Sequence, residues 1–177
     1  MILYFTPYDK TKNLGAAYNY YMNLVPEDSS ACLMDGDTCF LVPDFGNIIE
    51  DYSAAYPESV LTCKTNRIHR SSRQLDGGQM DENCNMRDLI KKAEARKHLR
   101  SVEEIKPGEG LSGFLLVVPK KIWKVIPFIE NGGCLGVDSQ FRIDLHYAGI
   151  KTYIMEGLLV FHQYRLLNSH LNTAHLV

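Results

Sequence analysis

Two aspartates that follow an apolar run are the residues of this chain best suited to chemistry. The run Ala31–Met34 is typical of a buried strand, and Asp35-Gly36-Asp37 comes directly after it. Open α/β sheets bind ligands at this edge of their strands. Two adjacent carboxylates repel each other unless a cation lies between them, and such oxygen ligands suit Mg²⁺ or Mn²⁺ on a substrate diphosphate. The pattern predicts a metal–diphosphate site, and an acidic turn that caps its own backbone explains it about equally well.

Two further residues are candidates for the same site. Asp138 follows a glycine-rich turn at the expected start of a helix. A carboxylate there can act as a general base or can simply favour the helix dipole. His162 ends the apolar run 158–161, and it becomes a candidate metal ligand only if that strand end meets Asp37 in space. Imidazole together with carboxylate suits Mn²⁺ better than Mg²⁺.

Basic and polar residues at two other places could contact an anion. Lys12 and Asn13 open a helix after the first strand, and helix N-termini attract anions, although an ordinary solvated first turn is an equal alternative. Arg67 begins a basic loop that continues with His69, Arg70 and Arg73. This loop could contact phosphate or an acidic acceptor, but a solvated surface is the interpretation that the pattern favours.

The elements that must position these residues alternate along the chain. Strands are expected over 2–6, 31–34, 60–63, 113–118, 151–155 and 158–162. Helices are expected over about 11–25, around Ile48 to Tyr52, and over 86–100, 119–126 and 137–148. This alternation predicts an α/β fold with one domain, a mostly parallel sheet and helices on both faces. The domain is expected to span 1–165, with 166–177 as a C-terminal tail.

Composition excludes several classes of protein. The chain has 177 residues and a formal net charge of −2, which argues against broad contact with a nucleic-acid backbone. No apolar run is long enough to span a membrane, and the N-terminus lacks the basic region and cleavage site of a signal peptide. Five cysteines without a CxxC pair indicate reduced thiols, so a cytoplasmic location is expected.

Taken in order, these landmarks resemble the glycosyltransferase-A fold, closest to family 2-like enzymes. The resemblance covers most of residues 2–165. It rests on five landmarks: an Asn-Leu-Gly helix start with Asn19, the strand ending in Asp35-Gly36-Asp37, Leu111-Ser112-Gly113-Phe114, Gly136-Val137-Asp138 with Phe141, and Ala148-Gly149-Ile150 before a strand ending in His162.

The resemblance implies metal-dependent transfer of a sugar, with inversion, from a nucleotide-sugar donor to a hydroxyl group of an unknown acceptor. Asp35, Asp37 and His162 would hold Mn²⁺ or Mg²⁺, with Asp37 as the firmer ligand. Asp138 would be the catalytic base. Contacts to the nucleotide would come from Thr6, Pro7, Tyr8, Lys12, Asn13 and Gly36, and contacts to the donor sugar or acceptor from Ser112, Gly113 and Arg67.

The chain also departs from this family. Val137 stands where the family usually has glutamate, and the strand and helix that usually precede the Asn-Leu-Gly helix are missing. An alternative is therefore a catalytically inactive glycosyltransferase-like module that binds a nucleotide sugar or a partner. A haloacid dehalogenase-like phosphatase is disfavoured because Cys39 stands where that family has threonine. A sugar-nucleotide pyrophosphorylase is disfavoured because the turn at 6–9 is not glycine-rich and basic.

Overall fold

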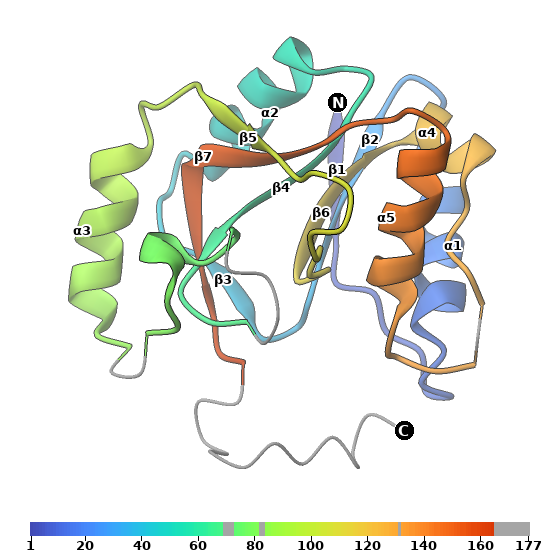
Figure 1. Ribbon diagram of the computed structural model, residues 1–177, viewed down its shortest axis with the longest axis horizontal. Helices are drawn as coiled ribbons and strands as arrows, with labels where there is room; N and C mark the ends of the chain where they lie inside the picture. Colours follow the sequence, from blue (N-terminus) through green and yellow to red (C-terminus); the bar gives the residue numbers. More distant parts are fainter. Residues whose placement is uncertain (69–72, 82–83, 131, 165–177) are drawn as a thin grey trace.

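A mixed seven-stranded sheet lies at the centre of the structure (Figure 1). The computed structural model describes residues 1–68, 73–81, 84–130 and 132–164. The expected tail 166–177 and the loop residues His69 and Arg70 therefore lie outside the described residues. Along the chain the elements are β1 (Ile2–Phe5), α1 (Leu14–Asn23), β2 (Ser30–Met34), β3 (Thr38–Phe40), α2 (Phe45–Ala55), β4 (Val60–Thr65), a 3₁₀ turn (Asp76–Gly78), α3 (Met86–Arg96), β5 (Val102–Glu104), β6 (Leu115–Pro119), α4 (Lys120–Val125), α5 (Val137–Tyr147) and β7 (Thr152–His162).

The direction of the strands differs from the prediction. The strand order is β1-β2-β6-β4-β7-β3, and β5 pairs with β7. The pairs β1–β2 and β4–β7 are parallel, whereas β2–β6, β4–β6, β3–β7 and β5–β7 are antiparallel. The prediction of a mostly parallel sheet is therefore wrong. Its basis was the alternation of strands and helices along the chain, which is typical of parallel sheets but does not fix the direction in which each strand pairs with its neighbours.

The prediction of helices on both faces is confirmed. One hydrophobic cluster contains α1, α4 and α5, and a second contains α2 and α3 on the opposite face of the sheet. Successive residues of a strand serve the two clusters in turn, since Ala31 and Leu33 belong to the first and Cys32 to the second. Because successive side chains of these strands are buried against helices on opposite faces, the strands consist of unbroken apolar residues.

A bend in β7 directs His162 toward the start of β3. The sequence predicted two short strands here, but β7 is one strand whose pairing with β4 jumps from Met155 to Leu159. Gly157 lies in the bend, where an added Cβ would be 2.6 Å from the Leu99 carbonyl oxygen. Its N–H donates to the Tyr52 hydroxyl at 2.8 Å. The second half of β7 then pairs with β3, which brings the end of this strand beside the acidic turn.

Asn19 fastens α1 to α4 and to the segment between α4 and α5. Its amide nitrogen donates to the Phe128 carbonyl and to Glu130 Oε1, both at 2.9 Å. Its amide oxygen accepts from Trp123 Nε1 at 2.8 Å and from the Phe128 N–H at 3.0 Å. One side chain thus satisfies polar groups at three positions, Trp123 of α4 and Phe128 and Glu130 after it, and so ties α1 to this part of the helical layer.

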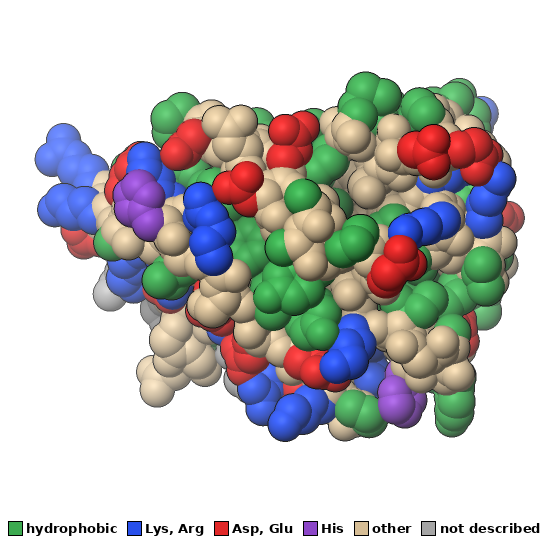
Figure 2. Space-filling model, turned by 90° about the horizontal axis from the view of Figure 1, so that it is seen from above, with side chains coloured by type: hydrophobic (Ala, Val, Ile, Leu, Met, Phe, Trp, Pro, Cys, Tyr) green, Lys and Arg blue, Asp and Glu red, His purple; other side chains and the backbone are tan. Residues whose placement is uncertain are grey.

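Charged side chains of both signs are interspersed over the surface in Figure 2, which shows the end of the molecule where β1 begins. This surface carries no large patch of one sign. In the part of the chain that the structure describes, no helix combines the length and apolar character needed to cross a membrane.

Candidate metal centre

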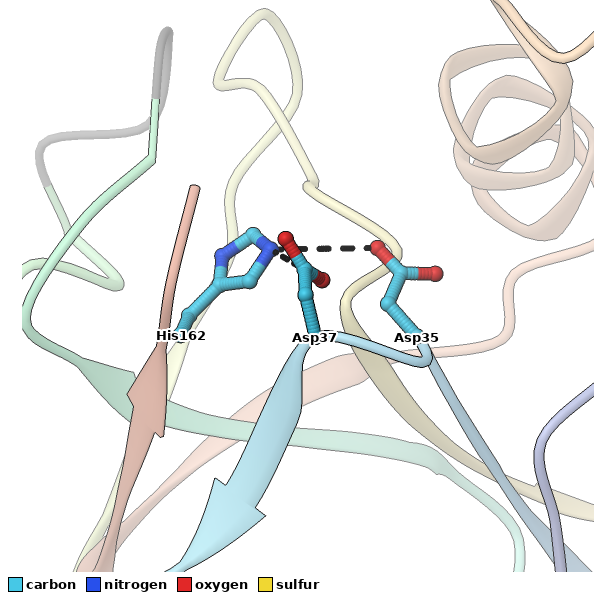
Figure 3. A group of neighbouring side chains, drawn as sticks. All are labelled: Asp35, Asp37 and His162. Atoms are coloured by element: carbon cyan, nitrogen blue, oxygen red, sulfur yellow. Dashed lines mark ion pairs between the residues drawn. The ribbon is translucent and has the colours of Figure 1, made fainter. Parts of the chain in front are cut away.

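Three side chains from two segments that are distant in the sequence lie together at one end of the sheet (Figure 3). Asp35 follows β2, Asp37 precedes β3, and His162 is the last residue of β7. One ligand atom from each lies within 4.8 Å of the other two. His162 Nε2 is 3.2 Å from Asp37 Oδ1 and 4.0 Å from Asp35 Oδ2. The end of the strand that carries His162 therefore lies beside Asp37. This was the condition under which the sequence made His162 a candidate metal ligand.

Backbone hydrogen bonds hold the two aspartates on the same side of the turn. The Thr38 N–H donates to the Asp35 carbonyl at 3.1 Å, which closes a tight turn, and the Asp35 N–H donates to the Phe114 carbonyl at 2.9 Å. Thr38 lies opposite His162 in the β3–β7 ladder, and the Gln163 N–H donates to the Asp37 carbonyl at 2.9 Å. Pairing of the backbone therefore sets the distance between Asp37 and His162.

The two carboxylates have different proton affinities. Burial raises the pKa of Asp35 to about 6, where the charge of His162 opposes the shift and the charges of Asp37 and Asp138 add to it. Burial also acts to raise the pKa of Asp37, but the hydrogen bond and charge of His162 outweigh it and hold that pKa below its usual value. A divalent cation between the carboxylates would favour the ionised form of both.

The surroundings of His162 fit a cation at Nε2. Nδ1 lies 2.9 Å from the Arg67 carbonyl oxygen, and the ring stacks on Phe114 with 5.3 Å between centroids. Because a carbonyl oxygen can only accept, Nδ1 must carry a proton, and Nε2 then faces the carboxylates. A ring between two acceptors satisfies both as an imidazolium, or as a neutral imidazole whose Nε2 binds a metal ion. The cluster can therefore hold a divalent ion with two carboxylates and one imidazole.

Asp138 lies next to this cluster without belonging to it. Its Oδ2 accepts from the Gly113 N–H at 3.0 Å and its Oδ1 from the Ser139 N–H at 2.7 Å. The next residue after Gly113 is Phe114, whose carbonyl binds the Asp35 N–H, so one short segment orients both aspartates. Burial raises the pKa of Asp138, while the backbone hydrogen bonds from Ser139 and Gly113 act against this shift. An added Cβ on Gly113 would lie 3.1 Å from that of Asp138, so a side chain at this position would require a small shift of Asp138.

The residues expected to contact a nucleotide occupy the segment between β1 and α1. Thr6 approaches the acidic turn, since its Cγ2 is 3.6 Å from the position of a Cβ on Gly36. The Tyr8 side chain is 78% exposed, and Pro7 is half-buried. Asn13 caps α1 by accepting from the Ala16 N–H at 3.2 Å, and the exposed Lys12 just before it has a φ of 62°.

Ser112 and Arg67 are both held by partners that the sequence did not indicate. The buried Gln74 accepts from the Ser112 N–H at 2.8 Å and donates to its carbonyl at 3.1 Å. Arg67 is buried rather than solvated, and it donates to the Tyr164 and Asp81 carbonyls. Sequence reasoning also missed Asn66, whose Oδ1 accepts from the His162 N–H at 2.7 Å. Its position directly after β4, at a strand end, was the available signal.

A pocket of the described structure lies away from the metal-ligand cluster. It has a volume of about 590 Å³ and is lined at the opposite end of β2 and β6 by residues including Ser30 and Pro119. Neither the three candidate metal ligands nor Asp138 lines it. The chemistry of the donor groups, and not the depth of a cavity, therefore identifies the candidate site.

Comparison of the chain with family models, with curated proteins and with solved structures gave no match.

Proposed function

We propose that the protein is a metal-dependent glycosyltransferase that moves a sugar from a nucleotide-sugar donor to an acceptor hydroxyl. The observation that carries the proposal is the convergence of Asp35, Asp37 and His162, with Asp138 anchored to the adjacent segment at Gly113. We further propose that the mixed sheet with helices on both faces is a compact form of the glycosyltransferase-A fold. A cytoplasmic location, consistent with five free cysteines, belongs to the same proposal.

In this proposal the three clustered side chains hold Mn²⁺ or Mg²⁺. The ion, when bound, neutralises the charge of the departing nucleoside diphosphate. The imidazole is presented through Nε2 because Nδ1 is engaged by the Arg67 carbonyl. The two aspartates supply the negative charge that matches a divalent ion, and the tight turn between them keeps both on one side.

Asp138 is the proposed catalytic base. The acceptor oxygen forms a bond to the anomeric carbon, the bond from that carbon to the diphosphate oxygen breaks with its electron pair, and the hydroxyl proton passes to Asp138. The N–H groups of Gly113 and Ser139 fix the orientation of the carboxylate. Burial favours its protonated form, which makes it a stronger base than an exposed aspartate.

The proposed nucleotide contacts are those nearest the acidic turn. Thr6 packs toward Gly36, and the exposed ring of Tyr8 follows two residues later, so this segment can reach a nucleotide whose diphosphate lies at Asp37. Lys12 and Asn13, at the start of α1, are the further proposed contacts.

The test measures release of nucleoside diphosphate from a panel of nucleotide sugars with and without Mn²⁺. The proposal predicts release that requires the metal. Asp138→Asn should keep the thermal stabilisation by the donor and lower the transfer rate by about 10²- to 10⁴-fold. Asp144→Asn is the matched control, because Asp144 lies on the same helix and pairs with Gln140. Equal rates for the Asp138 and Asp144 variants would contradict the role of Asp138. Stabilisation by nucleotides without any release would instead support the inactive binding module.

A further inference from the structure

The buried guanidinium of Arg67 joins two segments around the candidate metal centre. Arg67 is 5% exposed, although it follows β4 in a stretch that reads as a polar loop. Its Nε donates to the Tyr164 carbonyl at 3.0 Å and its Nη1 to the Asp81 carbonyl at 2.7 Å. A buried guanidinium is costly unless its donors are satisfied, so these bonds constrain both carbonyls.

The backbone of the same residue holds the His162 ring. The Arg67 carbonyl lies 2.9 Å from His162 Nδ1, and the neighbouring Asn66 Oδ1 accepts from the His162 N–H at 2.7 Å. Tyr164, which Arg67 Nε binds, is two residues beyond His162. The contacts thus close a loop from the Arg67 side chain to Tyr164, back along the chain to His162, and through its ring to the Arg67 carbonyl.

This closed loop determines which ring nitrogen faces the carboxylates. Rotation of the imidazole or displacement of the end of β7 would break the bond between Nδ1 and the Arg67 carbonyl. While that bond is present, Nδ1 carries the proton and Nε2 points to Asp37 at 3.2 Å (Figure 3). Hydrogen bonds of this kind set the tautomer and orientation of metal-binding histidines.

We infer that Arg67 is a positioning residue, which fixes His162 for metal binding through its own carbonyl and through its clamp on Tyr164. This inference rests on the metal centre of the proposed function and gives Arg67 a role different from contact with the donor or acceptor. A planar guanidinium suits the task, since its diverging N–H groups reach carbonyls on two segments at once, which a single ammonium group does less well.

The test uses Arg67→Met and Arg67→Lys in the chain of 177 residues, without any sugar donor. Arg73→Met is the matched control, because Arg73 belongs to the same connection between β4 and α3 but pairs with Glu103 and Glu109. Mn²⁺ affinity is measured by calorimetry. The tautomer of His162 is measured from the ¹⁵N signals of its ring in protein saturated with Mg²⁺, a diamagnetic ion, because a metal-bound imidazole is neutral and carries a proton on only one nitrogen.

Arg67→Met should lower Mn²⁺ affinity by about 10- to 100-fold and should give a mixture of His162 tautomers. Arg67→Lys should fall between this variant and the wild type, and Arg73→Met should keep both the affinity and the single tautomer. The inference is overturned if a folded Arg67 variant keeps wild-type affinity and tautomer, or if Arg73→Met changes both equally. If Arg67→Met does not fold, Arg67→Lys decides. Intact metal binding without sugar transfer would refute the proposed function and leave this inference standing.

Discussion

Replacing Asp37 with asparagine should remove most of the stabilisation that Mn²⁺ gives to the protein. The substitution keeps the size of the side chain but removes one of the two negative charges at the site. It also replaces a carboxylate ligand, 3.2 Å from His162 Nε2, by a neutral amide. The effect should therefore appear in metal binding and not as a general loss of folding.

The expected magnitude follows from linkage. An ion at 100 times its dissociation constant stabilises the folded state by about 2.7 kcal/mol. For a chain of 177 residues, each kcal/mol shifts the melting temperature by about 2–4 °C, so the wild type should gain about 5–11 °C. Loss of an ionic ligand should weaken binding at least about 100-fold, since loss of a hydrogen-bonding partner of a ligand already costs about 10- to 100-fold. The variant should then gain only about 1–2 °C at the same concentration.

The assay is thermal unfolding followed by circular dichroism over a titration of Mn²⁺. Asp51→Asn is the control, because Asp51 pairs with Arg100 on the surface and is not part of the metal-ligand cluster. The control should show the full wild-type shift. If Asp37→Asn also shows the full shift, Asp37 is not a ligand and the assignment of the centre is refuted.

Two further predictions concern pH and the helical layer. Mn²⁺ affinity should fall about tenfold per pH unit below about 6, because burial raises the pKa of Asp35 to that value and its proton must leave before the ion binds. Without metal, native Asp35 keeps its proton to higher pH than the unfolded chain does, so stability should decline as pH rises from about 4 to about 6. This decline should be modest since the side chain is 40% exposed; pH-independent affinity in calorimetry would refute the titration argument. Asn19→Ala should lower the free energy of unfolding in urea by about 2–4 kcal/mol, because Trp123 Nε1 and the Phe128 N–H lose their acceptor. Asn23→Ala, which removes one exposed hydrogen bond, should cost less than about 1 kcal/mol, and equal losses for the two variants would contradict this account.

The sequence predicted most of the long elements because the spacing of apolar residues along each element reflects which of its faces are buried. The apolar runs of β2 and β6 and the helical spacing of Phe141 and Leu145 in α5 each reflect contact with the core. The short strands β3 and β5 were missed. Glu103 and Glu104 make up most of β5, and Cys39 in β3 is exposed. Each strand has a single large apolar residue, Val102 or Phe40, so neither shows an apolar run. The direction of the strands could not be predicted from the sequence pattern either, because it depends on the path by which the chain returns to the sheet.

The candidate ligands could be found from sequence because strand ends are where side chains of a sheet gather. The placement of His162 beside Asp37 followed from that rule together with the resemblance. The polar residues that support them could not be found in the same way. Asn66, Arg67 and Gln74 are buried, although they belong to a stretch of polar residues. Such a stretch predicts an exposed loop, and only the folded structure shows that other parts of the chain cover it.

The most direct measurement of the central claim is an anomalous difference map from crystals of the protein grown with Mn²⁺. The account predicts one strong peak bonded to carboxylate oxygens of Asp35 and Asp37 and to Nε2 of His162. A peak elsewhere, or bonding through only one of these side chains, would contradict it.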